Sequence, residues 1–241
     1  MSYLEVTVFE LRLKVFLYKD MEWEECAYRI SKVIDTVLVE DKQLQEFHEK
    51  NCFKNYVFGG FAPFEKDKVY KKDHIYHIQL RTVDRGLAEY FNKNLEHFYN
   101  DYMNILSVEI KVLSKKYIDR LYCLTPIILK DYGAQGEKQG YWRSLFSIDF
   151  FERRIFENLI KKYNAFTGNK LSEDFELFTS IDLKNRKPIP FEYKGIKLLG
   201  DKADLTVNSN ESAQNLAYFA LGVGLGECNA RGAGFINYKS I

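Results

Sequence analysis

The spacing of hydrophobic residues predicts strands and helices over the first half of the chain. Residues 4–17 alternate between apolar and polar positions, which predicts a β-strand, and we expect a bulge near Phe9 and Glu10. From Glu22 the apolar positions recur every three or four residues, which predicts a helix with one buried face. A shorter helical segment is predicted over 41–51.

Two strands, one helix and a final strand complete this half. They are predicted as a strand over 53–61 that is broken at Gly59-Gly60, a strand over 73–83, a helix over 84–99 and a strand over 103–113. The order strand, helix, strand, strand, helix, strand is that of a ferredoxin-like domain. We therefore predict such a domain over residues 1–113.

The pattern then starts again after Ser114. The predicted elements are a strand over 116–130 with Pro126 at an edge or bulge, a polar glycine-rich loop over 131–140, a helix over 147–166, strands over 175–183, 189–193 and 195–207, a helix over 209–221 and a last strand over 232–241. This order approximates the first half. The predicted fold class is α+β, with two tandem ferredoxin-like domains over 1–113 and 114–241.

Local signals predict where the two helices of the second half begin and end. Asp149 with Glu152 has the spacing of a capping box at the start of the first helix. Ser209 or Asn210 is expected to cap the second helix, and Gly222 is expected to end it.

Composition and charge exclude several classes of protein. Hydrophobic residues make up 46% of the chain and the net charge is +1, which does not by itself predict nucleic-acid binding. Local basic clusters could still bind RNA, and three stand out: Lys115, Lys116 and Arg120; Arg143, Arg153 and Arg154; and Lys184, Arg186, Lys187, Lys194 and Lys197. The sequence lacks a signal-peptide pattern and any long apolar run, so we expect a cytoplasmic protein that does not enter a membrane.

The four cysteines are widely separated along the chain, at positions 26, 52, 123 and 228. No pair has the C-x-x-C spacing of a zinc site, and scattered free thiols fit a reducing cytoplasm. We therefore predict neither a metal site nor a cofactor.

The stretch GVGLGECNARGAGF, over 222–235, holds five of the 14 glycines. No lysine follows these glycines as a Walker loop requires, and a dinucleotide fingerprint needs a strand before the loop and a helix after it, the reverse of the predicted order. Two interpretations stay open. The loop either presents bare N–H groups to a phosphate or makes a tight connection between a helix and a strand.

The glycine spacing resembles a known motif. Gly224-Leu225-Gly226, five residues and Gly232-Ala233-Gly234 resemble the C-terminal signature of the CRISPR-associated endoribonucleases that process repeat RNA. Residues 47–49, Phe-His-Glu, and the stretch LTPIIL over 124–129 are similar to two further segments of that family, with Thr125 where a serine is usual. The resemblance covers essentially the whole chain and implies two ferredoxin-like domains.

This resemblance implies an activity and a set of site residues. The family cuts precursor CRISPR RNA without a metal, by attack of a ribose 2′-OH on the adjacent phosphate. It implies His48 as the catalytic histidine and Lys54 as an active-site lysine. The third catalytic position, often tyrosine, falls on Ser31, with Tyr28 one turn earlier.

The resemblance also implies a partner and an RNA-binding loop. CRISPR repeat RNA is the expected partner, and a CRISPR effector complex or a homodimer are further expectations. The residues expected to bind this RNA are Gly224, Gly226, Arg231, Gly232 and Gly234. An alternative is a repeat-RNA-binding module of the same fold that cuts poorly or not at all, because Ser31 replaces tyrosine. A ferredoxin-like regulator or metabolic enzyme explains the fold but not the glycine motif.

Overall fold

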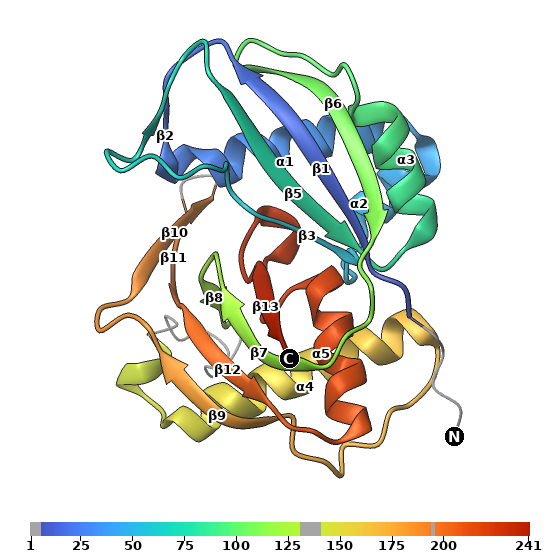
Figure 1. Cartoon of the computed structure of the whole chain (residues 1–241), viewed down its shortest axis with the longest axis vertical. Coiled ribbons are helices and arrows are strands. Elements are labelled where there is room, and N and C mark those ends of the chain that lie inside the picture. The colour runs from blue at the N-terminus through green and yellow to red at the C-terminus, as the bar shows by residue number, and fades with distance from the viewer. Residues whose placement is uncertain (1–5, 131–140, 194–195) are drawn as a thin grey trace.

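Two antiparallel four-stranded sheets, one above the other in Figure 1, organise the chain. This computed structural model describes residues 6–130, 141–193 and 196–241. The loop predicted over 131–140 lies outside the described residues. No helix in the described ranges combines the length and hydropathy that crossing a membrane requires.

The first half has the predicted strand and helix order. Its elements are β1 (Phe9–Leu17), α1 (Trp23–Val39), β3 (Tyr56–Phe58), β5 (Ile75–Thr82), α3 (Arg85–Leu95) and β6 (Met103–Val112). The strands lie in the order β3-β5-β1-β6. A short ribbon of β2 (Met21–Glu22) and β4 (Val69–Tyr70) and the helix α2 (Lys42–Glu49) are added to this core.

The second half repeats the same topology. Its elements are β7 (Ile118–Cys123), α4 (Ile148–Thr167), β9 (Phe178–Leu183), β12 (Ala203–Val207), α5 (Glu211–Val223) and β13 (Ile236–Ser240), and the strands lie in the order β13-β7-β12-β9. In both sheets the first strand of the unit pairs with the third and the fourth. The prediction of two ferredoxin-like domains is confirmed. A boundary near Ser114, in the connection between β6 and β7, stays a prediction.

A third, smaller sheet was not predicted. The predicted strand over 116–130 divides into β7 and β8 (Ile127–Ile128), with Pro126 between them. The predicted strand over 195–207 divides into β11 (Ile196–Asp201) and β12. With β10 (Ile189–Tyr193), β8 and β11 form a three-stranded sheet of order β10-β11-β8. Two 3₁₀ turns complete the described chain, η1 (Trp142–Ser144) and η2 (Asn229–Arg231).

Several local predictions at element ends are wrong. The irregularity in β1 lies between Lys14 and Val15, where the pairing with β6 shifts, and not near Phe9 and Glu10. Helix α4 begins after Ser147, and the capping box of Asp149 with Glu152 does not form. The physical reason is that the helix starts two residues earlier than that box requires.

The ends of α5 are partly as predicted. Asn210 caps the helix, because its side chain accepts a hydrogen bond from the N–H of Ala213 at 2.8 Å. The helix continues through Gly222 to Val223 and ends at Gly224, which has φ of +74°. A side chain at Gly222 would meet Val83 at 2.6 Å, so this glycine permits close packing against the first half rather than ending the helix.

Each half has its own apolar core. The alternation of β1 places Leu11, Leu13 and Val15 in the first core, against the buried faces of α1 and α3. Val8 and Val83 come from the first half but belong to the core of the second. The two halves therefore bury apolar surface against each other.

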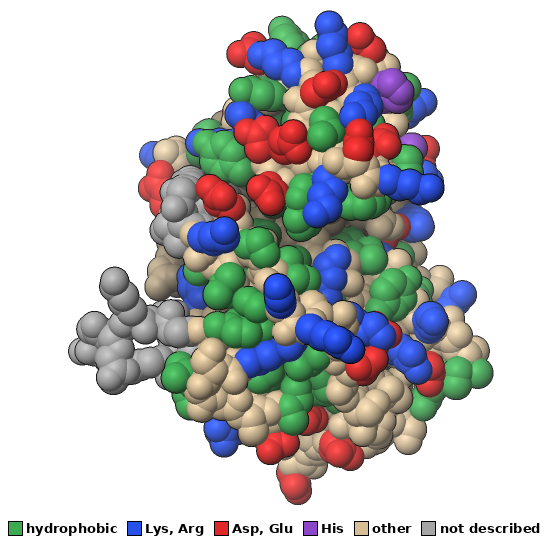
Figure 2. All heavy atoms as spheres, turned by 90° about the vertical axis from the view of Figure 1, so that its left-hand side faces the viewer, with side chains coloured by type: hydrophobic (Ala, Val, Ile, Leu, Met, Phe, Trp, Pro, Cys, Tyr) green, Lys and Arg blue, Asp and Glu red, His purple; other side chains and the backbone are tan. Residues whose placement is uncertain are grey.

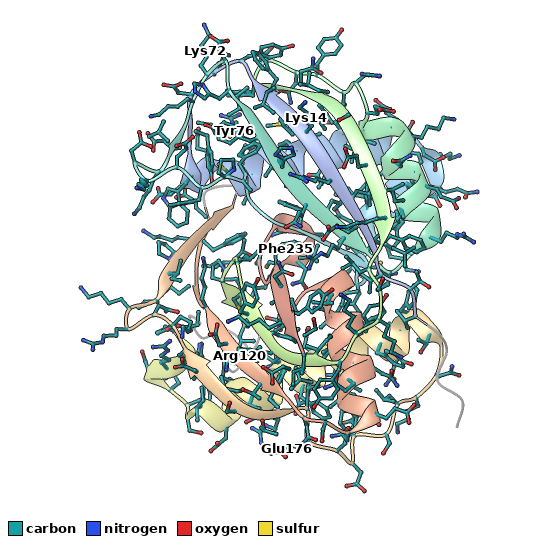
Figure 3. The ribbon with its side chains drawn as sticks, in the orientation of Figure 1. Lys14, Lys72, Tyr76, Arg120, Glu176 and Phe235 are labelled. Atoms are coloured by element: carbon teal, nitrogen blue, oxygen red, sulfur yellow. The ribbon has the colours of Figure 1, made fainter. Side chains whose placement is uncertain are left out.

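A buried arginine joins the two sheets. The Arg81 side chain on β5 is 2% exposed; its Nε donates to Glu10 Oε2 at 2.7 Å and its Nη1 to the carbonyl of Ile236 at 2.8 Å. Its guanidinium also lies 4.8 Å from the ring centre of Phe235, which is labelled at the junction of the two halves in Figure 3. Although burial opposes the charge of Glu10, Arg81 and Lys111 hold its pKa below the usual value.

We predict that Arg81→Met costs about 3–5 kcal/mol of unfolding free energy, because it leaves the buried Glu10 carboxylate with the amide of Gln79 and one exposed lysine as partners. Lys111→Met is the control, since Lys111 reaches the same carboxylate at 3.0 Å from a side chain that is 64% exposed. Urea denaturation at neutral pH measures both. In the wild type, the charged Glu10 contributes its full share of the unfolding free energy above pH 4.5, which is its pKa in the unfolded chain. This share is lost as the pH falls through the lower pKa of Glu10 in the folded chain. Equal losses in the two variants would contradict the role of Arg81.

Candidate active site

A cleft of about 380 Å³ lies between the end of α2 and the loop that follows α5. We call residues 224–234 the glycine loop. The side chains on the walls of this cleft come from both halves of the chain and include His48, Lys54, Lys130, Lys162 and Arg231. The fold thus brings together residues that are more than 180 positions apart in the sequence.

His48 lies near the C-terminal end of α2. Asp41 starts this helix by accepting hydrogen bonds from the N–H groups of Gln43 and Leu44 at 2.9 and 3.0 Å. The Nε2 of His48 lies 3.6 Å from Oδ1 of Asp35 on α1, and the side chain is 30% exposed. Its Nδ1 is buried and has no hydrogen-bond partner among the described residues. The carboxylate of Asp35 therefore lies beside the imidazole ring of His48.

Lys54 closes the end of the helix that carries His48. Its Nζ donates to the carbonyls of Phe47 at 2.5 Å and Lys50 at 2.6 Å, and it lies 3.8 Å from the Sγ of Cys52. The last carbonyls of a helix lack partners within the helix and carry partial negative charge. The Lys54 ammonium therefore supplies hydrogen-bond donors to the free carbonyls at the end of α2, including that of Phe47, the residue before His48.

The two candidates for the third catalytic position lie on α1 and not on the described walls of the cleft. Tyr28 packs in a small apolar cluster with Cys228 and Ala233 of the glycine loop. Ser31 is 1% exposed. The structure therefore places Tyr28 against the glycine loop and buries Ser31 on α1.

The glycine loop is packed too closely for side chains at four of its glycines. A Cβ added at Gly224, Gly226, Gly232 or Gly234 would approach another protein atom to less than 3.0 Å. The conflict is greatest at Gly234, where φ is +65° and the carbonyl oxygen of Leu225 would lie 1.9 Å away. The interpretation of the motif as a tight connection thus accounts for these four glycines.

The loop also leaves N–H groups free on the cleft side. Within the described chain, the N–H groups of Cys228, Asn229 and Ala230 donate to no acceptor, and all three residues line the cleft. Cys228 has a left-handed conformation, with φ of +62°, just before the 3₁₀ turn η2. Consecutive N–H groups in such a turn form an anion-binding concavity.

The residues expected to bind RNA do not all lie in the same cavity. Gly226 and Arg231 line the cleft. Gly232 lines a second cavity, of about 410 Å³, whose aromatic walls include Trp23, Phe61 and Phe191. Gly224 and Gly234 line neither of these cavities.

A buried lysine that the sequence analysis did not select holds the loop. Lys162 on α4 is 3% exposed, and its Nζ donates to the carbonyls of Gly224 at 3.0 Å and Gly226 at 2.7 Å. The same Nζ donates to Oδ1 of Asn229 at 2.6 Å. These three acceptors match the three donors of an ammonium group. The signal in the sequence is that Lys162 falls on the buried stripe of its helix, after Ile155 and Leu159.

Burial also changes the charge equilibrium of Lys162. Loss of water lowers its pKa to about 7, although Glu227 opposes the shift. The unfolded value is 10.5, so the unfolded chain binds the proton more strongly. The free energy of unfolding contributed by this group therefore rises as the pH increases from about 7 to 10.5.

Comparisons with known proteins identify the family. The family model described as CRISPR associated protein Cas6, C-terminal, matches residues 108–238 of the 241. The chain belongs to the Cas6 family. Among curated proteins, the CRISPR-associated endoribonuclease Cas6 2 of Methanocaldococcus jannaschii is 24% identical over 212 residues, which are 83% of this chain and 87% of that protein. The family resemblance of the glycine motif is confirmed.

Solved structures of Cas6 proteins share the fold. One described as CRISPR associated protein Cas6 has a TM-score of 0.73 at 18% identity and covers 98% of this chain and 100% of its own. A Cas6-related protein from Pyrococcus furiosus has a TM-score of 0.69 at 17% identity and covers 96% of this chain and 98% of its own. A Cas6 product complex has a TM-score of 0.68 at 17% identity, with coverage of 98% and 100%.

Many basic residues of this Cas6 family member pair with acidic groups. Arg143 donates to the buried Asp201 at 2.5 Å, Arg154 to Glu227 at 3.2 Å, and Lys184 to Asp182 at 2.9 Å. Figure 2 shows a band of Lys and Arg side chains across one face just below its middle, with Asp and Glu side chains above and below the band. Three basic residues that the clusters in the sequence did not indicate, Lys50, Lys130 and Lys162, line the cleft.

We predict that Lys162→Met lowers the free energy of unfolding by at least about 3 kcal/mol, because each of the three acceptors left buried and unpaired costs about 1–3 kcal/mol. Lys161→Met is the matched control, since Lys161 is the exposed neighbour on the same helix. Urea denaturation measures both variants. If the two are equally stable, the three hydrogen bonds do not hold the loop.

Proposed function

We propose that this Cas6 family member is an endoribonuclease that cleaves precursor CRISPR RNA within its repeats. One observation carries the proposal. The histidine expected from the sequence and the free N–H groups of the glycine loop line the same cleft, although they come from different halves. The Methanocaldococcus jannaschii relative, which is named an endoribonuclease, supports the same activity.

The reaction needs a proton acceptor, a proton donor and positive charge around one phosphate. The N–H groups of Cys228, Asn229 and Ala230, together with Arg231, hold the phosphate. The neighbouring 2′-OH loses its proton and forms a new P–O bond, and the bond from phosphorus to the 5′-oxygen breaks as that oxygen gains a proton. The products are a 2′,3′-cyclic phosphate and a 5′-OH. DNA lacks the nucleophile, so it is not cut.

His48 is the group that we assign to proton transfer. An imidazole side chain can both accept and donate a proton near neutral pH. Asp35 stabilises the imidazolium, and Lys54 fixes the helix end that carries the ring. Tyr28 packs against the glycine loop and Ser31 is buried on α1, and the third catalytic role expected at these positions stays a prediction. The step uses no metal and no cofactor.

A repeat-RNA-binding module that cuts poorly is the second candidate. One observation favours it. Neither Tyr28 nor Ser31 is among the described residues that line the cleft, and a site with one proton-transfer group would cut slowly. Both proposals take CRISPR repeat RNA as the partner and the cytoplasm as the compartment, and both are compatible with a homodimer or with assembly into a CRISPR effector complex.

We predict that His48→Ala slows single-turnover cleavage of a repeat RNA by about 10²–10⁴-fold, because a positioned acid or base contributes that much to the rate. Equilibrium binding should change little, since many phosphate and base contacts share the affinity. His74→Ala is the control, because His74 is exposed and its Nδ1 lies 2.9 Å from the carbonyl of Lys72, outside the cleft. If His48→Ala cuts within threefold of wild type, His48 is not the catalyst.

We predict that a repeat RNA with one 2′-deoxy substitution, 5′ of the scissile phosphate, binds normally and is not cut. The unmodified RNA should be cut at the same rate in excess EDTA. Gel analysis of products, with binding measured in parallel, checks both. Cleavage of the deoxy substrate would mean that water attacks, and loss in EDTA with rescue by one divalent ion would mean that a metal takes part.

A further inference from the structure

Lys130 is held at the edge of the cleft by its backbone. Its N–H donates to Oε2 of Glu227, and its carbonyl accepts from Nη2 of Arg154 at 2.9 Å. Arg154 also donates to Oε1 of Glu227 at 3.2 Å, and the N–H of Glu227 donates to the carbonyl of Ile128 at 2.9 Å. The end of β8, helix α4 and the glycine loop therefore fix the backbone of Lys130 together.

The side chain of Lys130 lines the cleft, and its charge acts on the glycine loop. Burial raises the pKa of the Cys228 thiol, and the ammonium of Lys130 and the guanidinium of Arg231 oppose that rise. Both cations therefore lie close to Cys228, and the side chain of Lys130 also forms a hydrogen bond with the thiol. No carboxylate of the described chain forms an ion pair with Lys130.

The other lysines of the cleft are differently placed. Lys162 gives all three donors to the glycine loop. Lys54 gives its donors to the end of α2 and to Cys52. Lys50 belongs to the opposite wall, at the end of α2. Among these lysines, Lys130 is therefore the one whose side chain reaches Cys228 of the glycine loop while its ammonium pairs with no carboxylate of the described chain.

We propose that Lys130 is a catalytic residue that contacts the scissile phosphate and stabilises the negative charge that grows on it during attack by the 2′-OH. This proposal rests on the proposed function and adds a residue to it. With Arg231 and the loop N–H groups, Lys130 completes an electrostatic site for the phosphorane. Arg154 and Glu227 fix the backbone from which the Lys130 side chain extends into the cleft.

The test compares Lys130→Ala, Lys130→Arg and the control Lys161→Ala, which removes the same charge from an exposed position outside the cleft. The probe is an RNA transcript of one repeat from the host CRISPR array. At saturating protein, Lys130→Ala should cut about 10²–10³-fold more slowly than wild type. Lys130→Arg should recover most of the rate, and Lys161→Ala should match wild type.

Binding as a function of salt gives an independent measure. Loss of one phosphate contact should reduce the slope of log affinity against log salt by about 0.7 for single-stranded RNA. Cleavage by Lys130→Ala within threefold of wild type, with an unchanged salt slope, would overturn the assignment. If wild type binds the repeat RNA but does not cut it, the proposed nuclease function fails, and an unchanged slope in Lys130→Ala would still overturn the phosphate contact.

Should the alanine variant fail to fold, Lys130→Gln removes the charge while keeping most of the side chain, and the same limits apply.

Discussion

The site depends on one buried ammonium group. Lys162 donates three hydrogen bonds into the glycine loop, to two carbonyls and to the side chain of Asn229. Asn229 in turn donates to the carbonyls of Leu225 and Ala233 at 3.0 Å each, so both arms of the loop are held around one lysine. Lys162 and Asn229 satisfy the carbonyls of the loop, and the N–H groups of residues 228–230, which line the cleft, have no acceptor within the described chain. Gly224 and Gly234 are needed because the two arms pack against each other without room for a Cβ, whereas a Cβ at Gly226 would meet β8 and one at Gly232 would meet Phe58.

The cleft exists only while the two halves keep their relative position. His48 belongs to the first half, and the glycine loop to the second. Arg81 joins them through the carbonyl of Ile236, and Gly222 allows α5 to pack directly on Val83. A base in one half and a phosphate site in the other can therefore act on one nucleotide, as the proposed cleavage requires.

The sequence predicts the helices and strands whose buried residues recur at a regular spacing along the chain. The alternation of β1 and the stripe of α1 lead directly to the ferredoxin-like order, and the glycine spacing leads to the family. Lys162 and Lys130 could not be found in this way. Their partners lie 62 or more residues away, at Gly224 and Glu227, and a lysine on an apolar stripe gives no sign of the acceptor it meets. The short strands of the third sheet are set by pairing across the fold rather than by local pattern.

In the proposed reaction, RNA is cut between His48 and the glycine loop. The most direct measurement is photo-cross-linking of an uncleavable repeat RNA that carries a photoreactive base beside the scissile position, followed by mass spectrometry of the linked peptides. We expect the linked peptides to come from both walls of the cleft, within residues 48–56 and 226–231. Cross-links confined to the second cavity, at Trp23, Phe61 or Phe191, would contradict cleavage between His48 and the glycine loop.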